Sequence, residues 1–249
     1  MSIDWLAPVR AALDDLDTVT EVFFRDDDAG WADDRLYALL DCFGKQAIPL
    51  DLALIPQALT QPLADALLQR RQCSPATLGL HQHGYSHSNH ETSARKCEFG
   101  PSRNYAHQYQ DLWLGKARLE AMLGPVPDKI FTPPWNRCTT ETANCLIDLG
   151  FQALSRDMTA TALHLNNLAE LPVGIDWCGI RAKNAKPWSA LADAISQRLF
   201  KASTNAIGIM LHHAVMDTED LAHLHPLLEL FSTHPKVDNR LMRECLATG

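Results

Sequence analysis

The sequence lacks the features that mark several large classes of protein. Its 249 residues contain no run of Lys and Arg, and 30 acidic residues outweigh 22 basic ones to give a formal net charge of −8. A nucleic-acid-binding groove normally needs a clustered basic surface, so no nucleic-acid partner is expected. No apolar stretch approaches the length of a membrane span, and the N-terminus does not have the basic and apolar segments of a signal peptide. The expected location is therefore the cytoplasm.

The cysteines give no sign of a disulfide framework. Their number, seven, is odd, and no two of them are spaced as Cys-x-x-Cys. Free thiols in a reducing compartment are the simplest interpretation. Apolar residues, in contrast, are plentiful: 46% of residues are hydrophobic and 21% are charged, so a sizeable core is expected. The cysteines are Cys42, Cys73, Cys97, Cys138, Cys145, Cys178 and Cys245.

Short apolar runs alternate along the chain with longer segments of helical periodicity. This alternation predicts a parallel sheet covered by helices, either as a barrel or as an open doubly wound sheet. No repeat or low-complexity linker divides the chain, so residues 1–249 are expected to form one domain. The expected strands are residues 19–24, 49–55, 76–81, 129–132, 151–155 and 207–212, and the expected helices are residues 33–44, 61–72, 102–123, 139–150, 187–201 and 218–231. Gly44 and Gly150 are expected to end helices, and Ser102 or Thr139 to begin them.

Four clusters of chemically capable residues follow these strands. They are residues 26–28, 81–83, 133–135 and 212–213. In parallel α/β folds, functional residues gather at the carboxyl ends of the strands, in the loops that lead to the next helix. Because all four clusters fall at that end of the expected sheet, they predict one shared site.

The first cluster consists of three consecutive acids, Asp26, Asp27 and Asp28. Clustered carboxylates repel one another unless a cation or a proton neutralises them, so a metal ion is a natural partner. The alternative is a solvated loop in which an Asp caps the helix that begins near Asp33.

The second cluster continues into a histidine-rich stretch, in which His83 and His87 are four residues apart. One helical turn would place both imidazoles on one side, and such a pair suits Zn²⁺ or a similar first-row metal. Together with an upstream carboxylate, the pair completes the ligand set of an open hydrolytic metal site. His81 and His90 are expected to support the ligands or to lie on the surface.

The last cluster ends an apolar strand with His212 and His213. One of them could be a general acid, because histidine titrates near neutral pH; a buried structural histidine is the alternative. Asp176 could orient such an imidazole and raise its pKa.

These clusters, in this order, resemble the motifs of the polysaccharide deacetylase superfamily, whose catalytic domain is also called the NodB homology domain. The matches span residues 23–213, and the His-x-x-x-His motif is the most specific of them. The matching residues are Asp27-Asp28, His83-Gly-Tyr-Ser-His87, the proline-rich segment 131–136, Asp176-Trp177 and Leu211-His212.

The resemblance implies a distorted (β/α) barrel similar to a TIM barrel, often with seven strands. It implies that Asp28, His83 and His87 hold a divalent metal, for which Zn²⁺ is the first choice and Co²⁺, Ni²⁺ or Mn²⁺ are possible. It also implies that Asp27 is the general base and His212 the general acid. Asp176 is then the residue that keeps His212 cationic.

Candidate substrate contacts lie around the same motifs. Trp135, Tyr85 and Trp177 could pack on a sugar face or belong to ordinary packing. The segment 88–104 is expected to form a lip over the site. The candidates for substrate binding are Tyr85, Pro134, Trp135, Asn136 and Leu211.

The sequence also departs from the family pattern. Three acids instead of two would allow Asp26 to be the base and Asp27 the ligand, and the doubled histidine leaves His213 open as the acid. Thr132 stands where the third motif normally has an Arg that braces the catalytic Asp; Arg25 or Arg156 could replace it.

The expected activity is removal of an acetyl or other acyl group from an N-acetylated sugar or glycan precursor, with a small molecule or oligosaccharide as substrate. The alternatives are a metal-dependent amidohydrolase acting on a non-sugar amide or ureide, and a degenerate homologue that binds carbohydrate without catalysis. A purely structural metal site would more often use cysteine ligands, and none lies near these histidines. No pattern indicates an oligomeric state.

Overall fold

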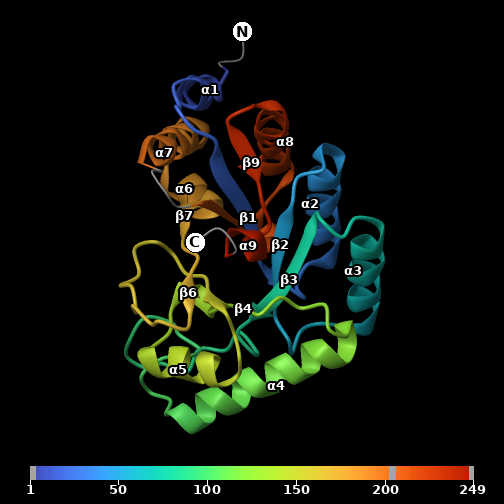
Figure 1. Cartoon of the computed structure of the whole chain (residues 1–249), viewed down its shortest axis with the longest axis vertical. Coiled ribbons are helices and arrows are strands. Elements are labelled where there is room, and N and C mark those ends of the chain that lie inside the picture. Colours follow the sequence, from blue (N-terminus) through green and yellow to red (C-terminus); the bar gives the residue numbers. More distant parts are fainter. Residues whose placement is uncertain (1–3, 202–205, 247–249) are drawn as a thin grey trace.

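A parallel sheet that curls into a barrel-like shape forms the centre of the molecule (Figure 1). The computed structural model describes residues 4–201 and 206–246. The strand order is β6-β5-β4-β3-β2-β1-β8-β7, and β9 pairs with β1. The predicted α/β barrel class is therefore confirmed. The strands are β1 Thr20–Ala29, β2 Leu50–Leu54, β3 Leu78–His83, β4 Ile130–Thr132, β5 Ala153–Leu154, β6 Ala169–Glu170, β7 Val173–Asp176, β8 Ile207–Leu211 and β9 Val237–Asn239.

The described sheet has nine strands, whereas seven were expected. β6 pairs with β5 and β7 pairs with β8, although only Leu171 and Pro172 separate β6 from β7. Residues 169–176 therefore begin in the strand at one edge of the sheet, β6, and end in the strand at the other edge, β7. Pro172 has no N–H to donate to a ladder, which fits a break at this point. Val173 N donates to Arg156 O at 2.8 Å, so the two ends of the curled sheet approach each other here.

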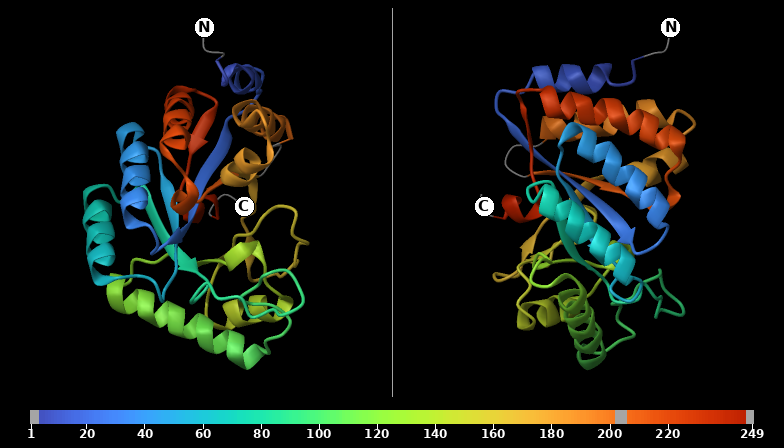
Figure 2. Two further views of the ribbon diagram at one scale, coloured as in Figure 1. Left: turned by 180° about the vertical axis from the view of Figure 1, so that it is seen from behind. Right: turned by 90° about the vertical axis from the view of Figure 1, so that its right-hand side faces the viewer.

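The helices lie around the outside of the strands (Figure 2). The apolar face of α2 packs on the sheet, where Phe43 meets Phe24 of β1 with ring centroids 5.0 Å apart, whereas α1 packs on α7. None of the described helices combines the length and apolar character needed to cross a membrane. The helices are α1 Ala7–Asp14, α2 Asp33–Gln46, α3 Gln61–Cys73, α4 Tyr105–Leu123, α5 Thr140–Asp148, α6 Trp177–Lys183, α7 Pro187–Lys201, α8 Thr218–Thr233 and α9 Met242–Cys245, with 3₁₀ turns η1 Pro134–Asn136 and η2 His213–Val215.

Two of the four predicted helix ends are confirmed. Thr139 caps α5 in a capping box, and Gly150 after α5 has a φ of +76°. Gly44 does not end α2, which continues to a left-handed Ala47. Ser102 does not cap α4, since the Asn104 side chain accepts from His107 N instead. Asn is among the best N-cap residues, so the later start is chemically reasonable.

Two strands run further than their apolar segments. β1 continues through Asp26, which is paired with Leu52 of β2 and Leu211 of β8, and β3 continues through His83. Pairing on both sides satisfies the backbone and extends these strands beyond their apolar residues. The polar residues therefore lie on the ends of rigid strands and not in loops.

Candidate active site

The three consecutive acids of β1 have three different partners. Along a regular strand, neighbouring side chains point to opposite faces. The pairing register of β1 with β2 shifts between Asp26 and Ala29, and Asp28 has a φ of +72°. This irregularity changes the direction of the last acid. As a result, Asp26, Asp27 and Asp28 each lie in a separate environment.

Asp26 forms a buried pair with His213. Its Oδ2 lies 2.6 Å from His213 Nδ1, and its Oδ1 accepts from His213 N at 2.9 Å. His213 Nε2 donates to Trp31 O at 2.7 Å, so both ring nitrogens are engaged. Burial alone would lower the pKa of His213, but the Asp26 carboxylate raises it to about 9. His213 thus holds β8 and the loop after β1 together, and Asp27 and His212 remain as the candidates for proton transfer.

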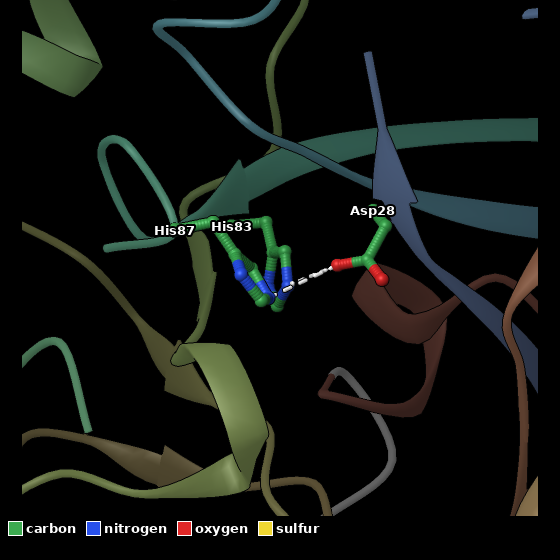
Figure 3. A group of neighbouring side chains, drawn as sticks. All are labelled: Asp28, His83 and His87. Carbon is green, nitrogen blue, oxygen red and sulfur yellow. Dashed lines mark hydrogen bonds and ion pairs between the residues drawn. The ribbon is translucent and has the colours of Figure 1, made fainter. Parts of the chain in front are cut away.

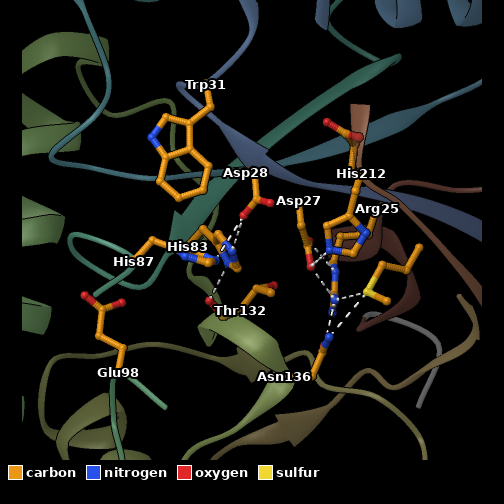
Figure 4. Close-up of polar contacts among 12 residues, drawn as sticks. Arg25, Asp27, Asp28, Trp31, His83, His87, Glu98, Thr132, Asn136 and His212 are labelled. Carbon is orange, nitrogen blue, oxygen red and sulfur yellow. Dashed lines mark hydrogen bonds and ion pairs between the residues drawn. The ribbon is translucent and has the colours of Figure 1, made fainter. Parts of the chain in front are cut away.

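Asp27 is buried and bound by Arg25 through both carboxylate oxygens. Arg25 Nε donates to Oδ1 and Nη2 donates to Oδ2, each at 2.8 Å (Figure 4). Burial alone would raise the pKa of Asp27, but the positive charges of Arg25 and then His83 outweigh it and lower the pKa. Arg25 also donates to Ser155 Oγ and to Asn136 Oδ1 at 2.7 Å each.

Of the two arginines considered for bracing the base, Arg25 is the one that contacts Asp27. Arg156 instead pairs with Glu170 at 2.6 Å. Asn136, expected to contact the substrate, holds the Arg25 guanidinium from the η1 turn. The brace thus comes from the same strand as the acid that it binds.

Asp28, His83 and His87 lie together in a ligand-like arrangement (Figure 3). Asp28 Oδ1 is 3.2 Å from His83 Nε2 and 3.1 Å from His87 Nε2. Burial alone would raise the pKa of Asp28, but the two histidines lower it. One oxygen and two nitrogens that lie within 4.8 Å of one another match the donors of a site for a divalent metal.

The orientation of the His83 ring also suits a metal ligand. His83 Nδ1 lies 3.0 Å from Thr132 O. A carbonyl oxygen only accepts, so Nδ1 is the protonated nitrogen and Nε2 is directed at Asp28. The Thr132 side chain lies 2.9 Å from His81 Nε2, which places His81 behind the ligands as a supporting residue.

The two histidines meet through a turn and not through the expected helical turn. His83 ends β3, and the turn reaches His87 through Gly84 with a φ of +58° and His87 with a φ of +57°. Buried Glu98 fixes this turn: it accepts from Tyr85 N at 3.2 Å, and from Ser86 N and Oγ at 2.8 and 2.9 Å. The sequence did not identify Glu98; its position between apolar Cys97 and Phe99 was the only signal.

Two tryptophans flank His87. The ring centroid of His87 is 4.9 Å from that of Trp31 and 4.5 Å from that of Trp135. Trp135 was among the expected substrate contacts, whereas Trp31 was missed because it lies beyond the acidic cluster without a motif of its own. Trp31 is 41% exposed, so its ring can contact a substrate as well as His87.

The remaining candidate residues for substrate contact differ in position. Pro134 packs beneath the turn at Gly84, where a Cβ would lie 2.6 Å from its ring. Tyr85 packs against a hydrophobic cluster that contains Phe99. Leu211 is fully buried in the core, and so is Trp177, whose Nε1 donates to Asp220 at 3.0 Å. The side chains of Leu211 and Trp177 cannot reach a substrate, which corrects the expectation for these two residues.

Asp176 does not contact His212 as expected. Its Oδ1 accepts from Gly179 N at 2.8 Å and caps α6. Within residues 4–201 and 206–246, no hydrogen bond or ion pair joins Asp176 to His212. His212, with 26% of its side chain exposed, has its Nε2 3.9 Å from Asp27 Oδ2 instead. Asp176 was expected to orient His212, but its carboxylate instead caps α6.

The sequence matches no family model and no curated protein. Solved structures nevertheless share this architecture at low sequence identity. A protein from Mycobacterium smegmatis that is assigned to the polysaccharide deacetylases has a TM-score of 0.69 at 16% identity, over 93% of this chain and 90% of its own. An allantoinase has a TM-score of 0.66 at 13% identity, over 92% and 89% of the two chains.

A family 4 acetyl xylan esterase from Clostridium thermocellum, solved with a cobalt ion, has a TM-score of 0.53 at 14% identity over 89% of this chain and 99% of its own. At these identities the likeness concerns the fold. The chain therefore has the fold of the polysaccharide deacetylases, as its motifs implied.

Proposed function

We propose that this chain, built on the polysaccharide deacetylase fold, is a metal-dependent hydrolase that removes an acetyl or other acyl group from the nitrogen of an N-acetylated sugar or glycan precursor. The observation that carries the proposal is the meeting of Asp28, His83 and His87 at one point beside an arginine-braced Asp27. A site that only binds carbohydrate would need neither of the proposed proton-transfer groups, Asp27 and His212.

Asp28, His83 and His87 would hold the metal, and Zn²⁺ is the first candidate, with Co²⁺, Ni²⁺ and Mn²⁺ as alternatives. The fit rests on the donor set and on the Thr132 carbonyl, which fixes Nε2 of His83 as the free nitrogen. When bound, such a metal lowers the pKa of water and polarises an acyl carbonyl.

Asp27 would take the proton from the attacking water. Its lowered pKa keeps it ionised at neutral pH, and Arg25 holds both oxygens in one orientation. Each carboxylate oxygen has a second lone pair, so binding to Arg25 leaves acceptor capacity for the water proton.

His212 would give a proton to the departing nitrogen. It is partly exposed, and its Nε2 lies 3.9 Å from Asp27 Oδ2, so donor and acceptor face the same space. The C–N bond breaks as water adds its oxygen to the acyl carbon; the products are a carboxylic acid and a free amine. Asp27 gains one proton and His212 loses one, so return of a proton from Asp27 to His212, whose Nε2 lies 3.9 Å from Asp27 Oδ2, would restore both groups for the next turnover.

A second candidate is hydrolysis of a ureide or another non-sugar amide. The likeness to an allantoinase favours it, because its TM-score of 0.66 is close to the 0.69 of the Mycobacterium smegmatis protein. The same acid, base and ligands would serve either reaction. A cytoplasmic location also belongs to the proposal and is supported by seven free cysteines, which suit a reducing compartment.

The test is a substrate panel measured with the purified protein loaded with Zn²⁺ or Co²⁺. Release of acetate from N-acetylated amino sugars is compared with hydrolysis of cyclic ureides, with Asp27→Asn as the control for turnover at this site. Acetate release that Asp27→Asn abolishes supports the proposal, and ureide hydrolysis alone supports the second candidate. Equal rates of hydrolysis by the wild type and Asp27→Asn on every substrate would indicate a homologue without catalysis.

A further inference from the structure

We propose that the substrate carries an anionic group, a carboxylate or a phosphate, and that Arg95, Arg137 and Lys183 bind it in a cleft beside the metal site. The proposal rests on the hydrolase function proposed above and adds a class of substrate to it.

The cleft has a volume of about 510 Å³ and adjoins the catalytic residues. Three of its lining residues also touch the site. Asn136 accepts from Arg25 at 2.7 Å, Met210 lies against the same guanidinium, and the Trp135 ring packs on His87. A molecule whose amide lay over the metal ligands would therefore extend into this cleft.

Three cations from separate segments converge on the cleft. Arg95 comes from the segment 88–104, Arg137 directly follows η1, and Lys183 ends α6. None of the three forms an ion pair with an acid of the described chain. The lining of the cleft thus gathers three cations in a protein whose formal net charge is −8.

Arg95 and Arg137 lie close enough to repel each other. Burial lowers the pKa of Arg137, and the positive charge of Arg95 lowers it further. Arg137 donates to Lys96 O at 2.8 Å, so a backbone carbonyl holds it in this position. An anion between the two guanidiniums would turn this repulsion into attraction, because each can donate to a carboxylate or phosphate.

The two acids that line the cleft are occupied by their own turns. Asp157 Oδ1 accepts from Thr159 N at 2.7 Å and from Thr159 Oγ1 at 2.5 Å. Asp176 Oδ1 accepts from Gly179 N at 2.8 Å. Neither forms an ion pair with the three cations among the described residues. Both carboxylates keep their negative charges, so the three cations and two acids of the lining leave a net charge of +1, which still favours an anionic ligand.

The substrate that fits both halves of the site is an N-acylated amino sugar with a carboxylate or phosphate. Its amide would lie at Asp28, His83 and His87, and its anionic group would lie between Arg95 and Arg137. Bidentate hydrogen bonds from guanidinium groups favour such oxyanions over neutral hydroxyl groups.

The test is calorimetric binding to zinc-loaded His212→Gln, which keeps the ligand set and should not turn substrate over. Three ligands are compared: N-acetylglucosamine, its 6-phosphate, and N-acetylmuramic acid, which carries a carboxylate. We expect one or both of the charged ligands to bind about 10- to 100-fold more tightly than the neutral sugar, with a preference that weakens as salt rises. The preferred ligand identifies the anion.

Adding Arg137→Gln, Arg95→Gln or Lys183→Gln should remove most of that preference and leave binding of the neutral sugar unchanged. Arg95 and Lys183 are exposed, so their variants should fold even if Arg137→Gln does not. Lys186→Gln, an exposed lysine outside the cleft lining, is the matched control. Equal affinity for all three sugars, or an undiminished preference in the arginine and lysine variants, would overturn the proposal.

These outcomes are separate from the fate of the hydrolase proposal, because binding is measured without turnover. Hydrolysis of neutral acetylated sugars together with equal affinities would retain the hydrolase and reject the anionic substrate. A preference for the charged sugars in a protein that hydrolyses nothing would retain the anion-binding cleft and reject the hydrolase.

Discussion

Arg25 and Asp27 form a fully buried ion pair, so replacing one partner leaves the other charge without compensation. We expect Arg25→Met to lower the free energy of unfolding by about 3–5 kcal/mol, the usual effect of breaking a buried pair. The double variant Arg25→Met/Asp27→Asn should recover much of the loss, since neither charge then remains. Urea denaturation measures both variants. A loss below about 0.5 kcal/mol in Arg25→Met would show that the pair is dispensable for stability.

The adjacent histidines should respond differently to the same substitution. His212→Gln should reduce kcat by about 10²- to 10⁴-fold, as loss of a general acid does, with little change in stability. His213→Gln leaves Asp26 buried without its partner and should destabilise the fold by about 3–5 kcal/mol. Steady-state kinetics and thermal denaturation of the two variants distinguish these roles. The reverse pattern, a stable and inactive His213→Gln, would reassign the acid.

At the scale of residues, the sequence predicted which side chains lie together better than it predicted the hydrogen-bond partners of each. Asp28, His83 and His87 do lie together, but spacing alone left Asp26 and Asp27 open as base and ligand, and the family resemblance favoured Asp27 and Asp28. The contacts of Asp176 could not be read from spacing, since capping α6 and orienting His212 require the same carboxylate. The choice between Arg25 and Arg156 also depended on the fold, because Ser155 and Asn136, which hold the Arg25 guanidinium, come from distant segments.

Glu98 links the segment 88–104 to the turn that holds His87. Glu98→Gln places an amide NH₂ where a carboxylate oxygen now accepts a backbone N–H, so the turn should loosen. We expect the affinity for Zn²⁺ or Co²⁺ to fall about 10- to 100-fold, as when support behind a metal ligand is lost. Chelator competition measures the affinity, and Co²⁺ absorption reports the geometry.

Glu91→Gln is the matched control for Glu98→Gln. Glu91 lies in the same segment, 88–104, but accepts from Ser102, away from the histidine turn. It should keep the wild-type affinity. If Glu98→Gln also kept that affinity and the same Co²⁺ spectrum, Glu98 would have no role in positioning the ligand.

At the scale of elements, periodicity located the strands but not their polar ends. The expected first strand stopped at Phe24, whereas β1 continues to Ala29 because β2 and β8 pair with it on both sides. The turn between His83 and His87 was equally hidden. Its two left-handed residues are stabilised by Glu98, which lies 11 residues beyond His87 in the sequence.

At the scale of the whole molecule, the core contains an acid far from the site. Asp51 of β2 is fully buried, with one oxygen accepting from Met242 N at 2.9 Å and the other without a partner in the described structure. Burial, and next the negative charge of Asp128, raises the pKa of Asp51 to about 8. The folded protein therefore keeps Asp51 protonated at neutral pH.

This raised pKa makes stability depend on pH. Above about pH 4 the unfolded chain releases the Asp51 proton, whereas the folded chain retains it until about pH 8. Over that window the unfolded state binds fewer protons, so the Asp51 contribution to the free energy of unfolding falls as pH rises, by up to about 1.4 kcal/mol per pH unit.

Asp51→Asn removes this contribution and should gain stability relative to the wild type as pH rises from 5 to 8. Urea denaturation at each pH measures the difference, and Asp193→Asn, an exposed acid, should keep the wild-type slope. A constant difference between Asp51→Asn and the wild type across the range would contradict a protonated Asp51.

The class of fold followed from the alternation of strands and helices, but the closure of the sheet did not. Residues 169–176 carry little strand pattern, because β6 has two residues and Pro172 interrupts the pairing. Only the three-dimensional arrangement shows that this segment joins β5 on one side and β8 on the other.

The central claim is that Asp28, His83 and His87 hold one divalent metal, and zinc stoichiometry tests it most directly. The wild type, His83→Ala and the exposed-histidine control His90→Ala are dialysed against Zn²⁺, passed through a desalting column and analysed for metal and protein. We predict about one zinc per chain for the wild type and His90→Ala, and less than about a tenth for His83→Ala. A full equivalent of zinc in folded His83→Ala would contradict the account.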